Sequence, residues 1–362
     1  MQKKEESYFV TKLGDDTVAV ESCQSNPTSV QGTSVVRTPR TVTRRFSMTL
    51  NSAGLPESFS LTTGPAEGGN QIVREFRYYD DSVVVVTTQN GSSKSTTVSV
   101  AGRPYPFFVN LFGVWEYAIR HALESSGPKE VALLIGDRES KYTIEGAARG
   151  KLELSSPPRG FGPLYATVDS SNSLLKFDLT PTTDKFIANR VPQLDVDMIA
   201  KDFTAQEQSG NGFGVLSPRD TARASVGGAE VLIDYGRPSM RGRTVFGAVV
   251  PWNTVWRLGA NAATQLVTNK TLTFGSSKVE PGTYSLFALP SESGWKLIIN
   301  RQHGQWGTVY DSTKDLARVP LKTAQLNDAV EQFTFNVDGK DKNGTLSFEW
   351  ERTKASIPFT VR

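Results

Sequence analysis

The chain has 362 residues, and its 40 Lys and Arg side chains nearly balance 37 Asp and Glu, which leaves a formal net charge of +3. So small a charge over so large a surface excludes strong long-range attraction to phosphate backbones, and we expect no nucleic-acid partner. The length exceeds that of a usual single core and 38% of the residues are hydrophobic, so the composition excludes disorder and predicts two globular domains.

The start of the chain and its single cysteine bear on location. No run of about 18 apolar residues occurs, so we expect a soluble chain without a transmembrane segment. The first six residues lead into a polar strand instead of an apolar signal core, so no signal peptide is visible. Cys23 stands alone, which excludes an internal disulfide and a cysteine-cluster metal site but leaves the redox compartment open.

Residues 7–105 predict a succession of β-strands. Apolar residues alternate with polar ones, as in strands that bury one face. The alternating apolar positions include Val18 and Val20, then Phe46, Met48 and Leu50, then Phe59 and Leu61. Asn90-Gly91 is a strong hairpin signal, because both residues tolerate a positive φ. The pattern predicts an antiparallel meander.

A helix is predicted at residues 107–123, where the period of the apolar residues changes. Phe108, Leu111, Trp115 and Ile119 fall on one helical face. We expect this helix to cover the curved sheet before it, since an aromatic face needs an apolar surface. Further strands are expected at residues 131–135, 151–154 and 174–179. The whole pattern is similar to the half-barrel sheets of lipoprotein-carrier proteins, in which a curved antiparallel sheet wraps around helices.

A stretch rich in Gly, Ser and Asn marks the predicted domain boundary. After a short helical pattern at residues 195–208, the sequence continues with Ser209-Gly210-Asn211-Gly212-Phe213-Gly214, a composition typical of flexible linkers. We therefore predict a curved antiparallel β domain over residues 1–205, a linker over residues 206–216 and a second domain over residues 217–362.

The second domain is also predicted to be all β. Alternation returns at residues 231–235, 333–337, 346–350 and 357–361. Residues 284–289 and 297–299 are continuous apolar runs, which suit strands buried on both faces. We expect an antiparallel β-sandwich or a flattened barrel. The fold class of the chain is therefore mainly β.

Several motifs of the second domain occur together and in order. They include Asp234-Tyr235-Gly236-Arg237-Pro238, Val250-Pro251-Trp252, Val255-Trp256-Arg257-Leu258-Gly259-Ala260-Asn261, Pro281-Gly282-Thr283-Tyr284 and Gln305-Trp306-Gly307. On these motifs, the segment from about Ser217 to Val361 resembles the bacterial domain-of-unknown-function family 2911. The resemblance implies an all-β fold and an exported protein. It implies no activity, because the family has none assigned.

The polar residues of this segment form the candidate ligand-binding site. Guanidinium groups bind carboxylates and phosphates bidentately and stack on aromatic rings, so arginines interleaved with aromatic residues predict an anionic or sugar-like ligand. The candidate residues are Arg237, Arg241, Arg243, Arg257, Asn261, Thr264, Tyr284 and Trp306. The alternative is that the arginines tie down long loops by bonding to carbonyl groups, and that the tryptophans belong to the core.

The two histidines are weaker candidates for chemistry. His303 follows a predicted buried strand and is the candidate general base, with an ordinary exposed loop histidine as the alternative. We expect His121, on the predicted helix, to be hydrogen-bonded or exposed. The two histidines lie far apart in the sequence without a paired carboxylate motif, so we predict no metal site. No phosphate or dinucleotide fingerprint occurs, so we predict no cofactor.

Three functions stay open at this point. The leading interpretation is a non-enzymatic ligand-binding or carrier-like protein of the bacterial envelope, periplasmic or extracellular, with a small polar, anionic or lipid ligand. One alternative is a hydrolase or lyase that acts on a small polar or sugar-like substrate through His303. The other is a structural subunit that binds a protein partner. A cytoplasmic location also stays open.

Overall fold

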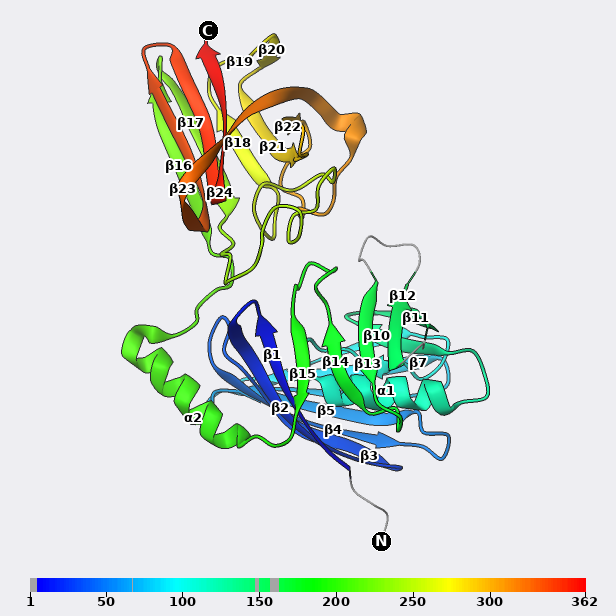
Figure 1. Ribbon diagram of the computed structural model, residues 1–362. Coiled ribbons are helices and arrows are strands. Elements are labelled where there is room, and N and C mark those ends of the chain that lie inside the picture. Colours follow the sequence, from blue (N-terminus) through cyan, green and yellow to red (C-terminus); the bar gives the residue numbers. More distant parts are fainter. Residues whose placement is uncertain (1–4, 67, 147–149, 157–162) are drawn as a thin grey trace. The chain divides into compact units, whose positions relative to one another are not determined.

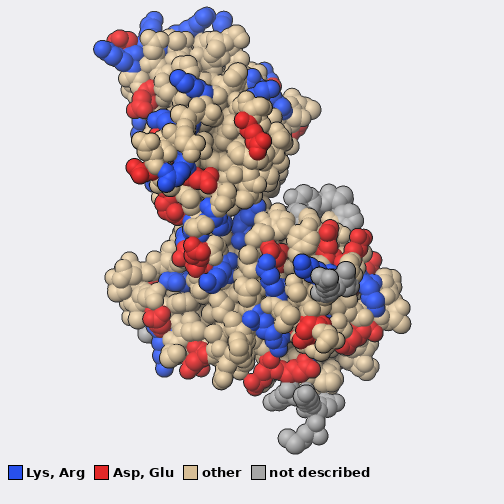
Figure 2. Space-filling model, in the orientation of Figure 1, with Lys and Arg blue, Asp and Glu red and all other residues tan. Residues whose placement is uncertain are grey.

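The computed structural model describes residues 5–66, 68–146, 150–156 and 163–362. The chain divides into two compact units, residues 1–214 and 215–362. Both are mainly β, as the alternation in the sequence predicts. None of the described helices has the length and apolar character needed to cross a bilayer. Basic and acidic side chains are mixed over the visible face of each unit, in keeping with the small net charge (Figure 2).

The described strands of the N-terminal unit form one fifteen-stranded sheet (Figure 1). Its order is β8-β7-β6-β5-β4-β3-β2-β1-β15-β14-β13-β12-β11-β10-β9, and neighbours are antiparallel except the parallel pair β9 and β10. The strands are β1 Glu5–Leu13, β2 Asp16–Asn26, β3 Ser29–Val36, β4 Val42–Leu50, β5 Pro56–Gly64, β6 Ile72–Tyr78, β7 Ser82–Gln89, β8 Ser92–Ser99, β9 Tyr105–Pro106, β10 Glu130–Ile135, β11 Arg138–Gly146, β12 Lys151–Ser155, β13 Leu164–Val168, β14 Leu174–Asp178 and β15 Ile187–Val191.

Hairpin turns set the order of the first eight strands. At the tip of the β7–β8 hairpin, Asn90 has a φ of 51° and Gly91 a φ of 74°, the positive values that a two-residue turn favours. At the other end of the meander, β1 pairs with β15. The strands that follow the helix in sequence therefore extend the same sheet instead of forming a second one.

Helix α1 (Phe112–Glu124) begins five residues after the predicted start at residue 107. Asn110 explains the difference, because its φ of 71° is left-handed and interrupts a right-handed helix. The residues before it form β9 and a turn, in which the N–H of Leu111 donates to the carbonyl of Phe108 at 3.2 Å. The helix contacts β2 and β3 as well as β9 and β10, strands from both halves of the sheet (Figure 1).

The aromatic face of α1 forms the centre of the N-terminal core. Trp115 is 3% exposed, and its ring centroid lies 4.7 Å from that of Phe177 on β14. Phe112 lies 5.8 Å from Phe177 and 6.0 Å from Phe9 on β1, measured between ring centroids. The prediction that an aromatic helix covers the sheet is therefore confirmed.

A buried glutamate side chain holds the start of α1. Glu21 on β2 is 1% exposed and accepts hydrogen bonds from the backbone N–H groups of Phe112 at 2.5 Å and Gly113 at 2.9 Å. The first turn of a helix leaves such donors without a helical partner. Position 113 must be glycine for close approach, since a Cβ there would lie 2.2 Å from Sγ of Cys23.

Helix α2 (Val196–Gln206) covers the opposite face of the sheet. Its Val196 and Phe203 pack with Val20 of β2 and Val35 of β3. Glu21, the next residue along β2, holds α1, and successive side chains of a strand point to opposite faces. The sheet of the N-terminal unit is therefore covered by α1 on one face and, over β2 and β3, by α2 on the other.

The first residues of the predicted linker are held against the N-terminal unit. Glu207–Asn211 form a π-helical turn, η2, that continues α2. Oε2 of Glu207 accepts a hydrogen bond from the N–H of Thr41 at 2.7 Å, and the Arg37 guanidinium lies 5.0 Å from the ring centroid of Phe213. The Gly and Ser content favours flexibility, but contacts with Arg37 and Thr41, in the loop after β3, give this stretch a defined place.

The described strands of the C-terminal unit form a nine-stranded sheet in the order β16-β17-β18-β21-β22-β23-β24-β19-β20. Its neighbouring strands are antiparallel. The strands are β16 Arg219–Val226, β17 Ala229–Gly236, β18 Thr264–Thr268, β19 Leu272–Phe274, β20 Ser277–Val279, β21 Gly282–Leu289, β22 Trp295–Asn300, β23 Asp315–Lys340 and β24 Asn343–Val361, with a 3₁₀ turn η3 at Ser312–Lys314.

The long strand β23 explains how one sheet encloses a core. Its first part, residues 315–321, pairs with β22, and its later part pairs with β24. The sheet folds over a shared core that includes Tyr235, Leu286, Ile299, Trp350 and Phe359. The end strands β16 and β20 do not pair with each other among the described residues, so the fold is sandwich-like and the sheet does not close into a barrel.

Candidate functional site

Two loops of the C-terminal unit pair with each other beside Arg257. One lies between β17 and β18, and the other follows β22. The N–H of Gly307 donates to the carbonyl of Asn261 at 2.9 Å, and the N–H of Ala263 donates to the carbonyl of Gln305 at 3.1 Å. We call residues 255–263 and 303–309 the paired loops. They bring together residues that lie more than 40 positions apart, as the 261–307 contact shows.

Arg257 carries a cationic group that has no partner among the residues that the structure describes. Its Nε is buried, and no hydrogen bond or ion pair joins its guanidinium group to the part of the chain that the structure describes. Burial lowers the pKa of Arg257. Desolvating a cation is unfavourable unless oxygen atoms replace the lost water, and a carboxylate usually does so. An anionic ligand would supply these oxygen atoms.

Trp306 and Asn261 lie on the same paired loops as Arg257. Trp306 is 52% exposed although it is a large aromatic residue, and it forms a β-bridge with Ala262. Asn261 is exposed, with its Nδ2 3.5 Å from the carbonyl of Ser217. The structure therefore brings three of the predicted site residues, Arg257, Asn261 and Trp306, onto the paired loops.

Arg237 has a full set of protein partners. Its Nη1 donates to Oδ2 of Asp220 at 2.9 Å, and its Nη2 donates to Oγ1 of Thr334 at 2.9 Å. Its Nε donates to the carbonyl of Phe333 at 3.2 Å. These bonds join the end of β17 to β16 and β23, which is the loop-tying role that the sequence left open.

Arg241 and Arg243 also contact the protein. Nε of Arg243 donates to the carbonyl of Met240 at 2.8 Å, and Nη2 donates to the carbonyl of Ser239 at 2.7 Å. The backbone N–H of Arg241 donates to Oε1 of Glu331 at 2.9 Å. Because all three arginines, Arg237, Arg241 and Arg243, interact with other residues of the protein, we build the candidate site without them.

Thr264 and Tyr284 complete the predicted set. Thr264 is fully buried, and its hydroxyl donates to the carbonyl of Leu258. The hydroxyl of Tyr284 donates to the carbonyl of Glu280 at 3.0 Å, and its ring packs against the core. Thr264 therefore shapes the loop that carries Arg257, and Tyr284 supports the turn before β21.

The histidines differ in their surroundings. His303 is exposed on the second of the paired loops, and its ring has no hydrogen-bond partner within the described residues. Nε2 of His121 lies 2.9 Å from the carbonyl of Ala53, and Nδ1 lies 3.0 Å from the hydroxyl of Tyr105. His121 therefore connects α1 to β9 and to the β4–β5 turn, as expected of a hydrogen-bonded histidine. Within the described ranges no three His, Cys, Asp or Glu residues are placed to hold a metal ion.

Gln305 is a site residue that was not among the predicted site residues. Its Oε1 accepts a hydrogen bond from the hydroxyl of Ser285 at 3.2 Å, whereas its Nε2 is buried without a partner in the described structure. The paired loops thus hold two nitrogen donors, Nε of Arg257 and Nε2 of Gln305, that are buried and unused. Gln305 stands in the Gln305-Trp306-Gly307 motif, but a single loop glutamine carries no periodic signal.

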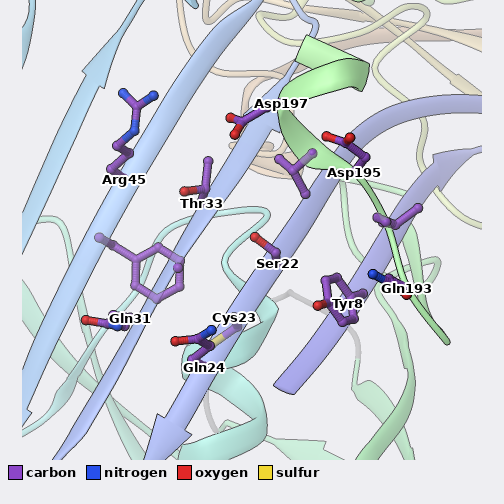
Figure 3. Close-up of a pocket in the computed structure, with 14 residues that line it drawn as sticks. Tyr8, Ser22, Cys23, Gln24, Gln31, Thr33, Arg45, Gln193, Asp195 and Asp197 are labelled. Atoms are coloured by element: carbon purple, nitrogen blue, oxygen red, sulfur yellow. The ribbon is translucent and has the colours of Figure 1, made fainter. Parts of the chain in front are cut away.

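A hollow in the N-terminal unit was not predicted from the sequence. It is a groove of about 590 Å³ over β1 to β4, and the residues just before and at the start of α2 form one wall (Figure 3). Its labelled side chains are mostly polar, with Arg45 and Asp197 toward one end and the amides Gln24 and Gln31 toward the other. The pairing of four strands, together with the start of α2, assembles this set.

Comparison with known proteins assigns one part of the chain. Residues 217–359 match the family model described as "Protein of unknown function (DUF2911)". The resemblance of the C-terminal domain is confirmed. The DUF2911 region includes the paired loops and ends near the end of β24, and residues 1–216 lie outside it. No curated protein matches the chain.

A solved structure with a match adds nothing to this assignment. It is described as "Cell entry of botulinum neurotoxin type C is dependent upon interaction with two ganglioside molecules", and the two chains are 10% identical. The match covers 99% of this chain and 88% of that chain, with a TM-score of 0.12. A TM-score this low supports no argument about fold or function. The comparisons also give no support to the expected similarity of the N-terminal part to lipoprotein carriers.

Proposed function

We propose that the DUF2911 region binds a small anionic ligand through Arg257, and that the protein is a non-enzymatic ligand-binding protein. One observation carries this proposal: the Arg257 guanidinium is partly buried and has no hydrogen-bond or carboxylate partner among the described residues. Arg237, on the same unit, shows the usual alternative, since it uses all three of its guanidinium nitrogens on protein oxygens.

The surroundings of Arg257 suit a carboxylate or a phosphate. Its planar guanidinium can donate two parallel hydrogen bonds to either group. The exposed ring of Trp306, on the other of the paired loops, offers a flat surface on which the body of a ligand can stack. The proposal assigns no chemical step to His303.

Isothermal titration calorimetry with inorganic phosphate and with succinate tests the proposal. We expect wild-type protein to bind at least one of them and Arg257→Gln to weaken binding at least tenfold, because hydrogen bonds to a charged group contribute about 1.5–3 kcal/mol. The matched control is Arg223→Gln on β16, which removes an exposed arginine from the same unit and should leave binding unchanged.

Three results would overturn the proposal. In the first, neither anion binds at millimolar concentration. In the second, wild-type protein and Arg257→Gln bind equally well. In the third, the Arg223→Gln control loses as much binding as Arg257→Gln. Unfolding of the DUF2911 region by Arg257→Gln, measured by circular dichroism, would make Arg257 a structural residue and would also reject the site.

We also propose a location in the bacterial envelope, because the family resemblance of the DUF2911 region implies an exported protein. Fractionation of the native host tests this, with an antibody against the chain and marker proteins for each compartment. Recovery in the periplasmic or extracellular fraction is the expected result. Recovery with the cytoplasmic marker would reject the envelope assignment but would leave the anion site standing.

A further inference from the structure

The floor of the groove in the N-terminal unit consists of two rows of side chains that cross four strands. In the first row Tyr8, Ser22, Thr33 and Arg45 are successive cross-strand partners on β1, β2, β3 and β4. In the second row the partners are Glu6, Gln24, Gln31 and Ser47. Side chains two residues apart share a face, so both rows face the groove side of the sheet. Each row crosses three strand spacings, about 14 Å.

Much of this floor has unused hydrogen-bonding groups. Four side chains of the floor make no hydrogen bond or ion pair to any residue that the structure describes. They are Ser22, Thr33, Gln31 and Arg45. Gln24 uses one amide hydrogen on Glu6, at 3.0 Å, and its carbonyl oxygen stays unused. Each glutamine amide presents both a donor and an acceptor, and each hydroxyl can act as either. Apart from the charged side chains of Glu6 and Arg45 at the ends of the rows, the floor therefore offers neutral donors and acceptors.

The wall beside this floor is rigidly placed. Asp195 caps α2 by accepting a hydrogen bond from the N–H of Met198 at 2.9 Å. Val196 is 6% exposed and packs with Val20 and Val35, the residues that form the next cross-strand row along β2 and β3. Gln193, also on the wall, has no described hydrogen-bond partner. The groove thus exists without any rearrangement of the helix (Figure 3).

The lining narrows the class of ligand. The carboxylates of Asp195 and Asp197 face the groove, and Glu6 adds a third at the β1 end of the second row. Arg45 is the one arginine among the lining residues, so an anionic ligand would meet net repulsion. The mostly polar floor does not suit an acyl chain. A peptide would find no main-chain partners, because the N–H and C=O groups of β2 and β3 are used in ladders on both sides. With anions, acyl chains and peptides disfavoured, a neutral ligand with many hydroxyl groups matches the groove.

We propose that this groove is a binding site for a neutral oligosaccharide. Sugar hydroxyls act as both donors and acceptors, as do the amides of Gln24 and Gln31 and the hydroxyls of Ser22 and Thr33. Tyr8 stands at the β1 end of the first row, and its ring supplies an amphipathic surface against which a sugar ring packs. This site is separate from Arg257 and does not depend on the anion site.

A glycan array tests the proposal. It carries neutral, sialylated and sulfated glycans and is probed with the full chain. Calorimetry then measures the affinity of the neutral glycan that binds most strongly. We expect neutral glycans to bind more strongly than their acidic counterparts. Gln31→Ala should weaken binding at least fivefold, and Ser22→Trp, which fills the middle of the groove, should abolish it. The matched control is Gln89→Ala, which removes an exposed glutamine from β7 of the same sheet.

Several outcomes would overturn the proposal. Absence of any neutral glycan binding would do so, as would binding that Gln31→Ala and Ser22→Trp leave unchanged. A preference for sulfated or sialylated glycans would contradict the charge argument. Binding of a Ser- and Thr-rich peptide, blocked by Ser22→Trp, in the absence of glycan binding would assign the groove to a protein partner. If Ser22→Trp unfolds the unit, Gln31→Ala still decides, because Gln31 is exposed and its truncation leaves the core intact.

Discussion

The backbone of Gly307 lies directly against the side chain of Arg257. A Cβ at position 307 would come within 2.2 Å of Cδ of Arg257 and within 2.6 Å of the carbonyl oxygen of Asn261. Atoms cannot approach so closely, so any side chain at this position has to displace Arg257 or separate the paired loops. Gly307 is therefore the residue that sets the position of the unpartnered guanidinium group.

Gly307→Ala should weaken phosphate or succinate binding at least tenfold, because Arg257 has to move. Overpacking of this kind also lowers the free energy of unfolding by about 1–3 kcal/mol. Calorimetry and urea unfolding measure the two effects. The control is Gly127→Ala, where a Cβ meets nothing within 4 Å. Unchanged anion affinity in Gly307→Ala would show that the position of Arg257 does not matter for binding.

Trp115→Ala should destabilise the N-terminal unit by about 3–5 kcal/mol, the usual range for deletion of a buried aromatic side chain. Trp115 is 3% exposed and lies 4.7 Å from Phe177 between ring centroids. Trp306→Ala, the comparison variant, removes a tryptophan that is 52% exposed and should change stability by less than about 1 kcal/mol. Urea unfolding followed by circular dichroism measures both. Equal effects of the two substitutions would contradict the burial of α1.

The stability of the N-terminal unit should fall as the pH rises from 5 to 8, because of Glu21. Burial raises the pKa of Glu21 from its ordinary value of 4.5 to about 8, although the N–H groups of Gly113 and Phe112 oppose the shift. Between these two values the folded protein keeps a proton that the unfolded chain releases. The free energy of unfolding then decreases by at most about 1.4 kcal/mol per pH unit.

Glu21→Gln should remove this slope, since an amide does not titrate in the range. The measurement is urea unfolding at pH 5, 6, 7 and 8 for both proteins. Below the ordinary pKa both states of wild-type Glu21 are protonated, so the slope should also disappear toward pH 4. A slope of the same size in Glu21→Gln would assign the pH dependence to other groups.

Elastase should cleave the native chain first after Val215. Val215 is 54% exposed. The stretch just before it is anchored by two hydrogen bonds. The Thr38 hydroxyl donates to the carbonyl of Gly214 at 2.9 Å, and Nη2 of Arg37 donates to Oε1 of Gln206 at 2.7 Å. Locally anchored backbone resists proteases. Mass spectrometry should find two stable fragments.

Arg37→Ala removes part of that anchor and should make residues 207–214 susceptible as well. Thr62→Ala, a substitution on β5 away from this stretch, serves as the control. First cleavage inside a strand of either unit, such as β17, would contradict the division of the chain at residues 214 and 215.

The sequence by itself determined the features that depend on neighbouring residues. The alternation of Phe46, Met48 and Leu50 identifies β4, because a strand places every second side chain on the same face. Asn90-Gly91 identifies a hairpin tip, because both residues accept a positive φ. The ordered motifs of the second domain identify the DUF2911 region. These signals are local, and they give the mainly β class and the covering helix.

The tertiary structure decided which polar groups have partners. Arg237 and Arg257 both belong to motifs of the second domain, but Arg237 binds Thr334, 97 positions away, and Arg257 has no partner among the described residues. The start of α1 depended on the left-handed Asn110, which the apolar spacing does not reveal. The polar rows of the groove exist only through the register of four strands. Hydrogen bonds and desolvation act between atoms close in space, so periodicity along the chain cannot specify them.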